Sequence, residues 1–81
     1  MTKIIKVQYY ALLREERGES HETIPTNAKT ARELYDELQR KYGFRLNTDL
    51  LKVAVNGEFC DWQRELKTKD TVVFIPPVAG G

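Results

Sequence analysis

The segment "TARELYDELQRKYG", residues 30–43, carries the clearest helical pattern in the chain. Thr30 and Glu33 form a capping box, in which each side chain can bond a free backbone amide of the first turn. Gly43 follows as a typical C-terminal stop. The apolar positions recur at helical spacing and form one stripe: Ala31, Leu34, Leu38 and Tyr42. At about 1.5 Å per residue, this helix is roughly 20 Å long and can cover one face of a small sheet.

The segment before this helix begins with a predicted strand over residues 3–10. Its residues alternate in polarity, as they do in a strand with one face buried. Ile4 and Tyr10 are expected on the outer face. The residues expected to point inward are Ile5, Val7 and Tyr9.

Two weaker elements connect that strand to the helix. Residues 11–18 read "ALLREERG" and predict a short helical turn that Gly18 ends. Thr23 and Ile24 predict a second strand, which we expect to end at Pro25 because proline cannot donate a ladder hydrogen bond.

A hairpin is predicted after the helix, in the segment "LLKVAVNGEFC". Val53 and Val55 alternate toward the core, and Asn56-Gly57 is a strong signal for a two-residue turn. Phe59 then returns on the partner strand, on the face away from the helix.

The last predicted strand covers residues 71–75. Val72 and Phe74 point to one face, and Val73 and Ile75 point to the other. Pro76 and Pro77 then end the sheet, because neither has a backbone N–H to donate.

The predicted order is therefore strand, strand, helix, strand, strand, strand, which places the chain in the α+β class. The arrangement that suits this order is the β-grasp: a mixed sheet of about five strands, with one main helix packed on one face. In it the first and last strands lie side by side and run parallel. We expect residues 1–75 to form this domain and residues 76–81 to form a flexible C-terminal tail.

Composition excludes several classes of function. The chain has 81 residues, is 41% apolar and 31% charged, and carries a net charge of +1. The sequence has no cluster of basic residues that would indicate binding to nucleic acid or to an anionic membrane. The N-terminal segment does not resemble a signal peptide, and no apolar run is long enough to span a membrane. With a single cysteine the chain has no internal disulfide, so we expect a cytoplasmic protein.

Few residues could carry chemistry of their own. One histidine, His21, and one cysteine, Cys60, cannot build a four-ligand zinc site, so no metal is expected. A catalytic pair of His21 and Cys60 would require that they be adjacent in space. Cys60 is more simply explained as a small, half-buried apolar residue. His21 is more simply explained as an exposed residue with no functional role. No glycine-rich phosphate loop is present, and no bound cofactor is expected.

The sequence "VVFIPPVAGG", residues 72–81, suggests a different kind of reactive group. The prolines stiffen the start of this arm, and Gly80 and Gly81 leave its end without side chains. Six residues after Ile75 can reach roughly 20 Å from the sheet. Such an arm can enter a narrow channel and present its terminal carboxylate, which becomes an electrophile once it is adenylated.

Three motifs carry a resemblance that covers essentially the whole chain. They are "YYALLRE" at residues 9–15, "AVNGEF" at 54–59 and "FIPPVAGG" at 74–81. Their order and spacing resemble the small subunits of molybdopterin synthase, which typically end in Pro-Pro-Val-Ser/Thr-Gly-Gly. Ala79 departs mildly from this pattern, and Lys69-Asp70 stands where the family usually has Gly-Asp.

The resemblance implies a ubiquitin-like sulfur carrier. In that family a ubiquitin-activating-type adenylyltransferase uses ATP to adenylate the terminal glycine, here Gly81, which is then converted to a thiocarboxylate. The tail, here Pro76, Pro77, Val78, Ala79 and Gly80, inserts into the large synthase subunit and delivers sulfur to cyclic pyranopterin monophosphate. The complex resembles a heterotetramer, and the small subunit donates sulfur without catalytic residues of its own.

Three other functions use the same features. A protein modifier linked to lysines needs the same activated Gly81. A sulfur carrier for thiamine or for tRNA thiolation is a further alternative, although thiamine carriers usually lack the Pro-Pro-Val sequence. A β-grasp interaction module with an idle tail is the fourth reading.

A partner-binding surface is expected on the sheet face away from the helix. Tyr10, Phe59, Val73 and Ile75 are predicted there, and several large apolar groups on one open face usually mark a partner site. A register shift of one residue would instead bury them. Arg14 is expected to contact the partner or the tail, or to be a surface charge. Trp62 is either a partner anchor or a local cover over the hairpin.

Overall fold

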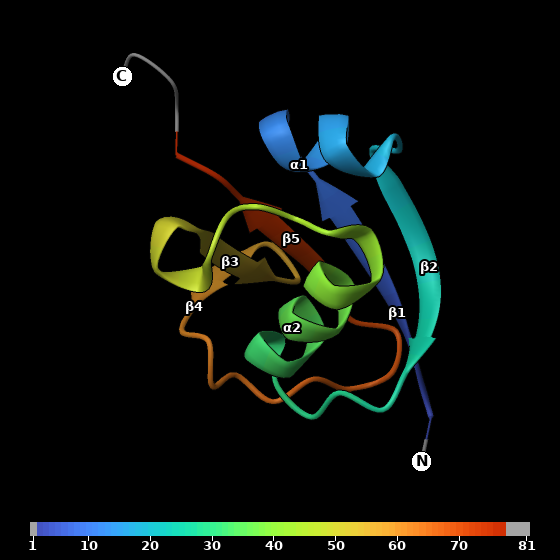
Figure 1. Ribbon diagram of the computed structural model, residues 1–81. Coiled ribbons are helices and arrows are strands. Elements are labelled where there is room, and N and C mark those ends of the chain that lie inside the picture. The colour runs from blue at the N-terminus through green and yellow to red at the C-terminus, as the bar shows by residue number, and fades with distance from the viewer. Residues whose placement is uncertain (1, 78–81) are drawn as a thin grey trace.

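The computed structural model describes residues 2–77 and contains one five-stranded mixed sheet with two α-helices (Figure 1). The strand order is β2-β1-β5-β3-β4; β1 and β5 run parallel, and the other neighbours are antiparallel. This confirms the predicted α+β fold and its β-grasp arrangement. The elements are β1 (Lys3–Tyr9), α1 (Ala11–Arg17), β2 (His21–Thr26), α2 (Ala31–Tyr42), the 3₁₀ turn η1 (Thr48–Leu50), β3 (Lys52–Val55), β4 (Glu58–Cys60) and β5 (Thr71–Ile75).

The helix α2 lies across one face of the sheet, and the inward residues of the strands meet its apolar stripe (Figure 1). Ile5, Val7 and Tyr9 of β1 are buried, as their alternation predicts. From β3 and β5 the core receives the predicted inward residues, which are also fully buried: Val53, Val55, Val72 and Phe74. None of the helices in the described part of the chain is long and apolar enough to cross a membrane.

Both ends of α2 match the sequence prediction. The Thr30 side chain accepts a 3.2 Å hydrogen bond from the Glu33 backbone amide. The Glu33 carboxylate reaches back one residue further than expected, to the backbone amide of Lys29 at 3.1 Å. Gly43 ends the helix with a φ of +71°, a conformation that favours glycine.

Two predicted strand ends are wrong by one residue. The first strand ends at Tyr9, and Tyr10 is the N-cap of α1. The second strand continues through Pro25 to Thr26. Pro25 is tolerated because β2 is an edge strand, so only one of its sides needs hydrogen bonds to a neighbour.

A layer of aromatic rings joins α2 to the sheet. The Tyr35 ring meets Phe74 edge-on, with 5.1 Å between centroids, and the Trp62 ring stacks on Phe74 at 5.9 Å. The Tyr35 hydroxyl donates to the Leu46 carbonyl at 2.6 Å, and burial raises the pKa of Tyr35 to about 12. Since Trp62 is half-buried against these rings, its local covering role is the one that this geometry favours.

Candidate functional site

The sheet face opposite α2, which we call the open face, carries a row of four aligned residues, three of them apolar. The register aligns Gln8 of β1 with Val73 of β5, Val73 with Ala54 of β3, and Ala54 with Phe59 of β4. Phe59 is the most exposed large apolar side chain of the described residues, at 70%. Neighbours in such a row lie close enough for their side chains to touch, so the row forms one surface.

The apolar row continues toward the end of β5. Ile75 follows Val73 on the same face and lines a hollow together with Tyr10, which is half exposed at the start of α1. The structure therefore brings together the four apolar residues predicted for a partner site. With Ala54, which lies in the same row and is buried, they form the open-face patch: Tyr10, Ala54, Phe59, Val73 and Ile75. Val73 and Ile75 are half-buried rather than fully exposed, because neighbouring side chains of the sheet cover part of each.

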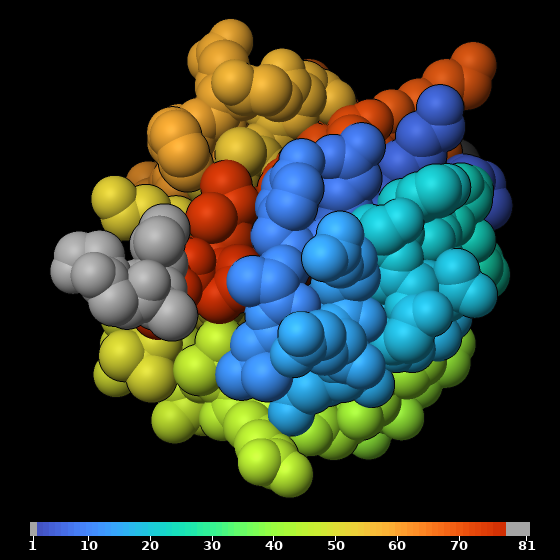
Figure 2. Space-filling view, turned by 90° about the horizontal axis from the view of Figure 1, so that it is seen from above, coloured from blue at the N-terminus to red at the C-terminus, as the bar shows by residue number. Residues whose placement is uncertain are grey.

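The residues Ile75, Pro76 and Pro77, which we call the tail base, lie between two hollows. One hollow, of about 540 Å³, is lined on its far side by α1 and Leu46. The other, of about 350 Å³, is lined by the segment from Asp49 to Lys52. Figure 2 shows the end of β5 in red with α1 in blue on one side and the yellow η1 segment on the other. Pro76 is buried between them and Pro77 is exposed.

Two exposed leucines beside the tail base escaped the sequence analysis. Leu12 of α1 is 39% exposed and lines the larger hollow, and Leu50 of η1 is 53% exposed and lines the smaller one. Each precedes another leucine in the sequence, and only that neighbour, Leu13 or Leu51, is buried. The two pairs of adjacent leucines were the signal that could have identified them. Consecutive side chains of a short helical turn point in different directions, so only one of each pair faces the core.

The position of α1, and so of one hollow wall, depends on a carboxylate that receives four hydrogen bonds. Glu22 of β2 accepts from Tyr9 at 2.6 Å, from Tyr42 at 3.0 Å, and from two nitrogens of Arg17 at 3.1 Å each. The Arg17 guanidinium also lies 4.2 Å above the Tyr42 ring. Arg17 is the last residue of α1, so this cluster fixes the end of that helix to β2 and to α2.

The same cluster shifts two acid–base equilibria. Burial by itself would raise the pKa of Glu22, but the hydrogen bonds from Arg17, Tyr9 and Tyr42 outweigh burial and lower it. Burial, together with the hydrogen bond to Glu22, raises the pKa of Tyr9 far above its ordinary range. The carboxylate is therefore charged and the phenol neutral over the whole physiological range.

The other predicted polar residues are dispersed. Arg14 is exposed on α1 and lines a shallow hollow with Gln8, Tyr10 and His21, beside the open-face patch. His21 and Cys60 lie on β2 and β4, at opposite edges of the sheet, which rules out a catalytic pair. Burial raises the pKa of the Cys60 thiol, whose Sγ lies 3.9 Å from the Val53 carbonyl oxygen.

No cluster of three or more potential metal ligands occurs within residues 2–77. The remaining predicted site residues lie outside the described part of the chain: Val78, Ala79, Gly80 and Gly81. What the described residues provide is an apolar surface that continues from the open face to the two sides of the tail base.

The chain is similar in sequence and fold to several known proteins. A model of the ThiS family matches residues 7–81. A Pyrococcus furiosus protein, described as a candidate subunit 1 of a molybdopterin converting factor, is 31% identical over 94% of this chain and 99% of its own, with a TM-score of 0.74. A chain in the complex of subunits 1 and 2 of the Helicobacter pylori molybdopterin-converting factor is 27% identical over 100% of both chains, with a TM-score of 0.65.

A third solved structure shows how widely the fold is shared. SAMP1 from Haloferax volcanii matches 96% of this chain and 99% of its own with a TM-score of 0.78, at 21% identity. That likeness shows the fold alone.

Proposed function

Because the chain belongs to the ThiS family, we propose that it is a sulfur carrier whose reactive group is the carboxyl of Gly81. The observation that carries the proposal is the family match itself, which runs through the Gly80-Gly81 pair. The apolar surface beside the tail base supports it, since an enzyme that acts on this carboxyl needs a surface to hold.

The proposed chemistry proceeds in two steps. The Gly81 carboxylate attacks the α-phosphorus of ATP in an adenylyltransferase of the ubiquitin-activating type, forming an acyl-adenylate and releasing pyrophosphate. Hydrosulfide, or a sulfur donor of equivalent oxidation state, then attacks the carbonyl carbon. A C–S bond forms, the C–O bond to AMP breaks, and AMP leaves with the electron pair. The product is a thiocarboxylate, with sulfur in place of one oxygen.

The acceptor that we propose is cyclic pyranopterin monophosphate, within a molybdopterin synthase complex. Two of the solved structures similar to this chain carry the name of molybdopterin converting factor, one at 31% and one at 27% identity. In this proposal Pro76, Pro77, Val78, Ala79 and Gly80 enter the large subunit, and the open-face patch contacts its surface. We assign the acid–base residues of the transfer step to that partner. The charged residues of this chain that line the two hollows beside the tail base are Glu15, Asp49 and Lys52.

Intact-mass spectrometry tests the first part of the proposal. The chain is incubated with an adenylyltransferase of this type, ATP and sulfide, and compared with a sample without ATP. We expect a gain of about 16 Da, the difference between sulfur and oxygen in the acyl group. Deletion of Gly81 should abolish the gain. A ladder of adducts on other proteins would instead support a protein modifier, and an unchanged mass would support an interaction module.

The acceptor requires a second measurement. The thiocarboxylated chain is mixed with subunit 2 of the Helicobacter pylori factor and cyclic pyranopterin monophosphate. We expect the chain to lose about 16 Da as its sulfur is transferred, while the pterin gains sulfur. A chain that acquires sulfur in the first assay but keeps it here belongs to another sulfur pathway.

A further inference from the structure

The open face differs from the rest of the molecule in its charges. The register places on this face two lysines, one histidine and no carboxylate among its strand residues. These residues are Ile4, Lys6 and Gln8 of β1; His21, Thr23 and Pro25 of β2; Thr71, Val73 and Ile75 of β5; Lys52 and Ala54 of β3; and Phe59 of β4. Both of the charged strand residues on this face are therefore basic, in a chain with 13 basic and 12 acidic residues.

The two lysines lie on opposite sides of the open-face patch. Lys6 is aligned with Thr71 and Lys52 with Ile75, so Val73 lies between their two rows. With about 3.3 Å per residue and about 4.8 Å per strand, the lysine Cα atoms are roughly 16 Å apart. Both side chains are exposed, and neither forms an ion pair with another residue of the range 2–77.

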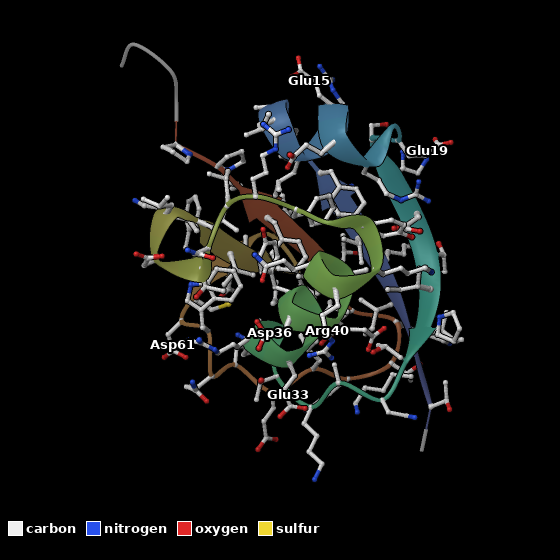
Figure 3. All side chains as sticks on the ribbon, in the orientation of Figure 1. Glu15, Glu19, Glu33, Asp36, Arg40 and Asp61 are labelled. Atoms are coloured by element: carbon white, nitrogen blue, oxygen red, sulfur yellow. The ribbon has the colours of Figure 1, made fainter. Side chains whose placement is uncertain are left out.

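Two acidic residues lie beside the tail base: Glu15 lines the larger hollow, and Asp49 lines the smaller one together with Lys52. The acidic residues next to the ends of β4 and β5 point elsewhere or are already bonded. Glu58 is aligned with the inward residue Val55, so it belongs to the other face of β4. The Asp70 carboxylate accepts hydrogen bonds from the Asn56 side chain and the Lys67 amide. Figure 3 shows Glu33 and Asp36 on α2, which covers the opposite face of the sheet, and Glu15 on α1.

The length of chain beyond Pro77 brings a tail-binding protein close to this face. Four residues follow Pro77 and span at most about 14 Å when extended. A protein whose active site holds the Gly81 carboxyl must therefore approach to within that distance of the end of β5. The open-face patch adjoins the tail base at Ile75, so it is an apolar surface within reach of that protein.

We propose that the protein that receives the tail has an apolar docking site rimmed by aspartate and glutamate, which pair with Lys6 and Lys52. This inference rests on the proposed function only in assuming that a partner binds the tail. The apolar patch supplies buried area at the centre, and the lysines supply orientation and a faster encounter at the rim. Lys6 and Lys52 are thus specificity-determining residues for the partner.

Binding to subunit 2 of the Helicobacter pylori factor tests the proposal, by titration calorimetry in 0.1 M and 1 M NaCl. Lys6→Glu and Lys52→Glu should each weaken binding about fivefold to tenfold at the lower salt concentration. In 1 M NaCl the loss should fall below about twofold, because the screening length shrinks from about 10 Å to about 3 Å. Lys29→Glu, an exposed change next to α2, is the matched control and should leave binding unchanged. Absence of binding by the original chain, or equal losses at both salt concentrations, would overturn the proposal.

A second measurement needs no partner. In NMR, the paramagnetic relaxation of backbone amide protons by an anionic and by a cationic nitroxide reports the sign of the local electrostatic potential. We expect the anionic probe to act more strongly at Val73 and Ala54, and the order to reverse in the Lys6→Glu, Lys52→Glu double variant. A stronger effect of the cationic probe on the original chain would overturn the basic character of this face. Neither experiment depends on sulfur transfer, so a chain that gains no mass at Gly81 can still pass both.

Discussion

The phenol of Tyr9 donates a 2.6 Å hydrogen bond to the carboxylate of Glu22, between neighbouring strands of the sheet. The same carboxylate bonds Arg17 of α1 and Tyr42 of α2. Four elements of the fold thus meet at one side chain, which is only 13% exposed. Neutralising Glu22 should therefore lower the free energy of unfolding more than neutralising an exposed carboxylate does.

We expect Glu22→Gln to lower the free energy of unfolding by about 2 kcal/mol, because Arg17 and the two phenols lose a charged acceptor in a largely dry site. Urea denaturation followed by circular dichroism measures this as a lower midpoint with an unchanged slope. Glu19→Gln is the control, since Glu19 is exposed and forms no ion pair among the described residues. Equal midpoints for the two variants would show that the cluster does not stabilise the fold.

The lowered pKa of Glu22 also predicts how stability depends on pH. A carboxyl whose pKa is lower in the folded state stabilises the fold above its unfolded pKa, which is near 4.5. That contribution is lost as the pH falls from this value through the folded pKa. The free energies of unfolding of the original chain and of Glu22→Gln should therefore differ at pH 7 and converge toward pH 2. A difference that stays constant across this range would contradict the assignment.

Two phenylalanines of the sheet should differ greatly in how much the same substitution affects stability. Phe74 is fully buried against Tyr35 and Trp62, so Phe74→Ala should cost about 3 to 5 kcal/mol or prevent folding. Phe59 is 70% exposed, so Phe59→Ala should change stability by less than about 0.5 kcal/mol. Thermal unfolding of both variants decides this. The proposed role of Phe59 in partner binding further predicts that Phe59→Ala weakens binding to the tail-receiving protein while leaving the melting temperature unchanged.

Ala11 offers a test of backbone strain. It begins α1 with a φ of +52°, in the left-handed region that side chains with a Cβ rarely adopt. Ala11→Gly should therefore raise the free energy of unfolding by about 0.5 to 1 kcal/mol. Ala31→Gly is the matched change at the first residue of α2, where the alanine is buried with ordinary helical geometry, and it should destabilise. Chemical denaturation of both variants measures these changes. Destabilisation by Ala11→Gly would show that the backbone at this position is not strained.

Much of the fold could be predicted because its signals are local. The capping residue Thr30 and the stop Gly43 bound α2, and the alternation of β1 assigned Ile5 and Val7 to the core before any strand partner was known. The turn at Asn56-Gly57 was equally readable, since both residues have positive φ in the structure. These features depend on neighbours within a few residues.

The candidate site was only partly predictable. Alternation placed Phe59 and Val73 on the outer face, and the structure aligns both with Ala54. Leu12 and Leu50 were missed, because their exposure depends on which neighbour faces the core rather than on their own type. Pro25 was misjudged because its effect depends on whether its strand lies at an edge of the sheet.

By itself the sequence determined the elements and their buried faces, since periodicity and capping are properties of consecutive residues. The tertiary structure alone decided which elements became neighbours. It brought Tyr9, Arg17 and Tyr42 to one carboxylate, and it set Lys6 and Lys52 on either side of Val73. The physical reason is that strand order and register are fixed by burial of the whole core, so contacts between distant residues exist only once that core has formed.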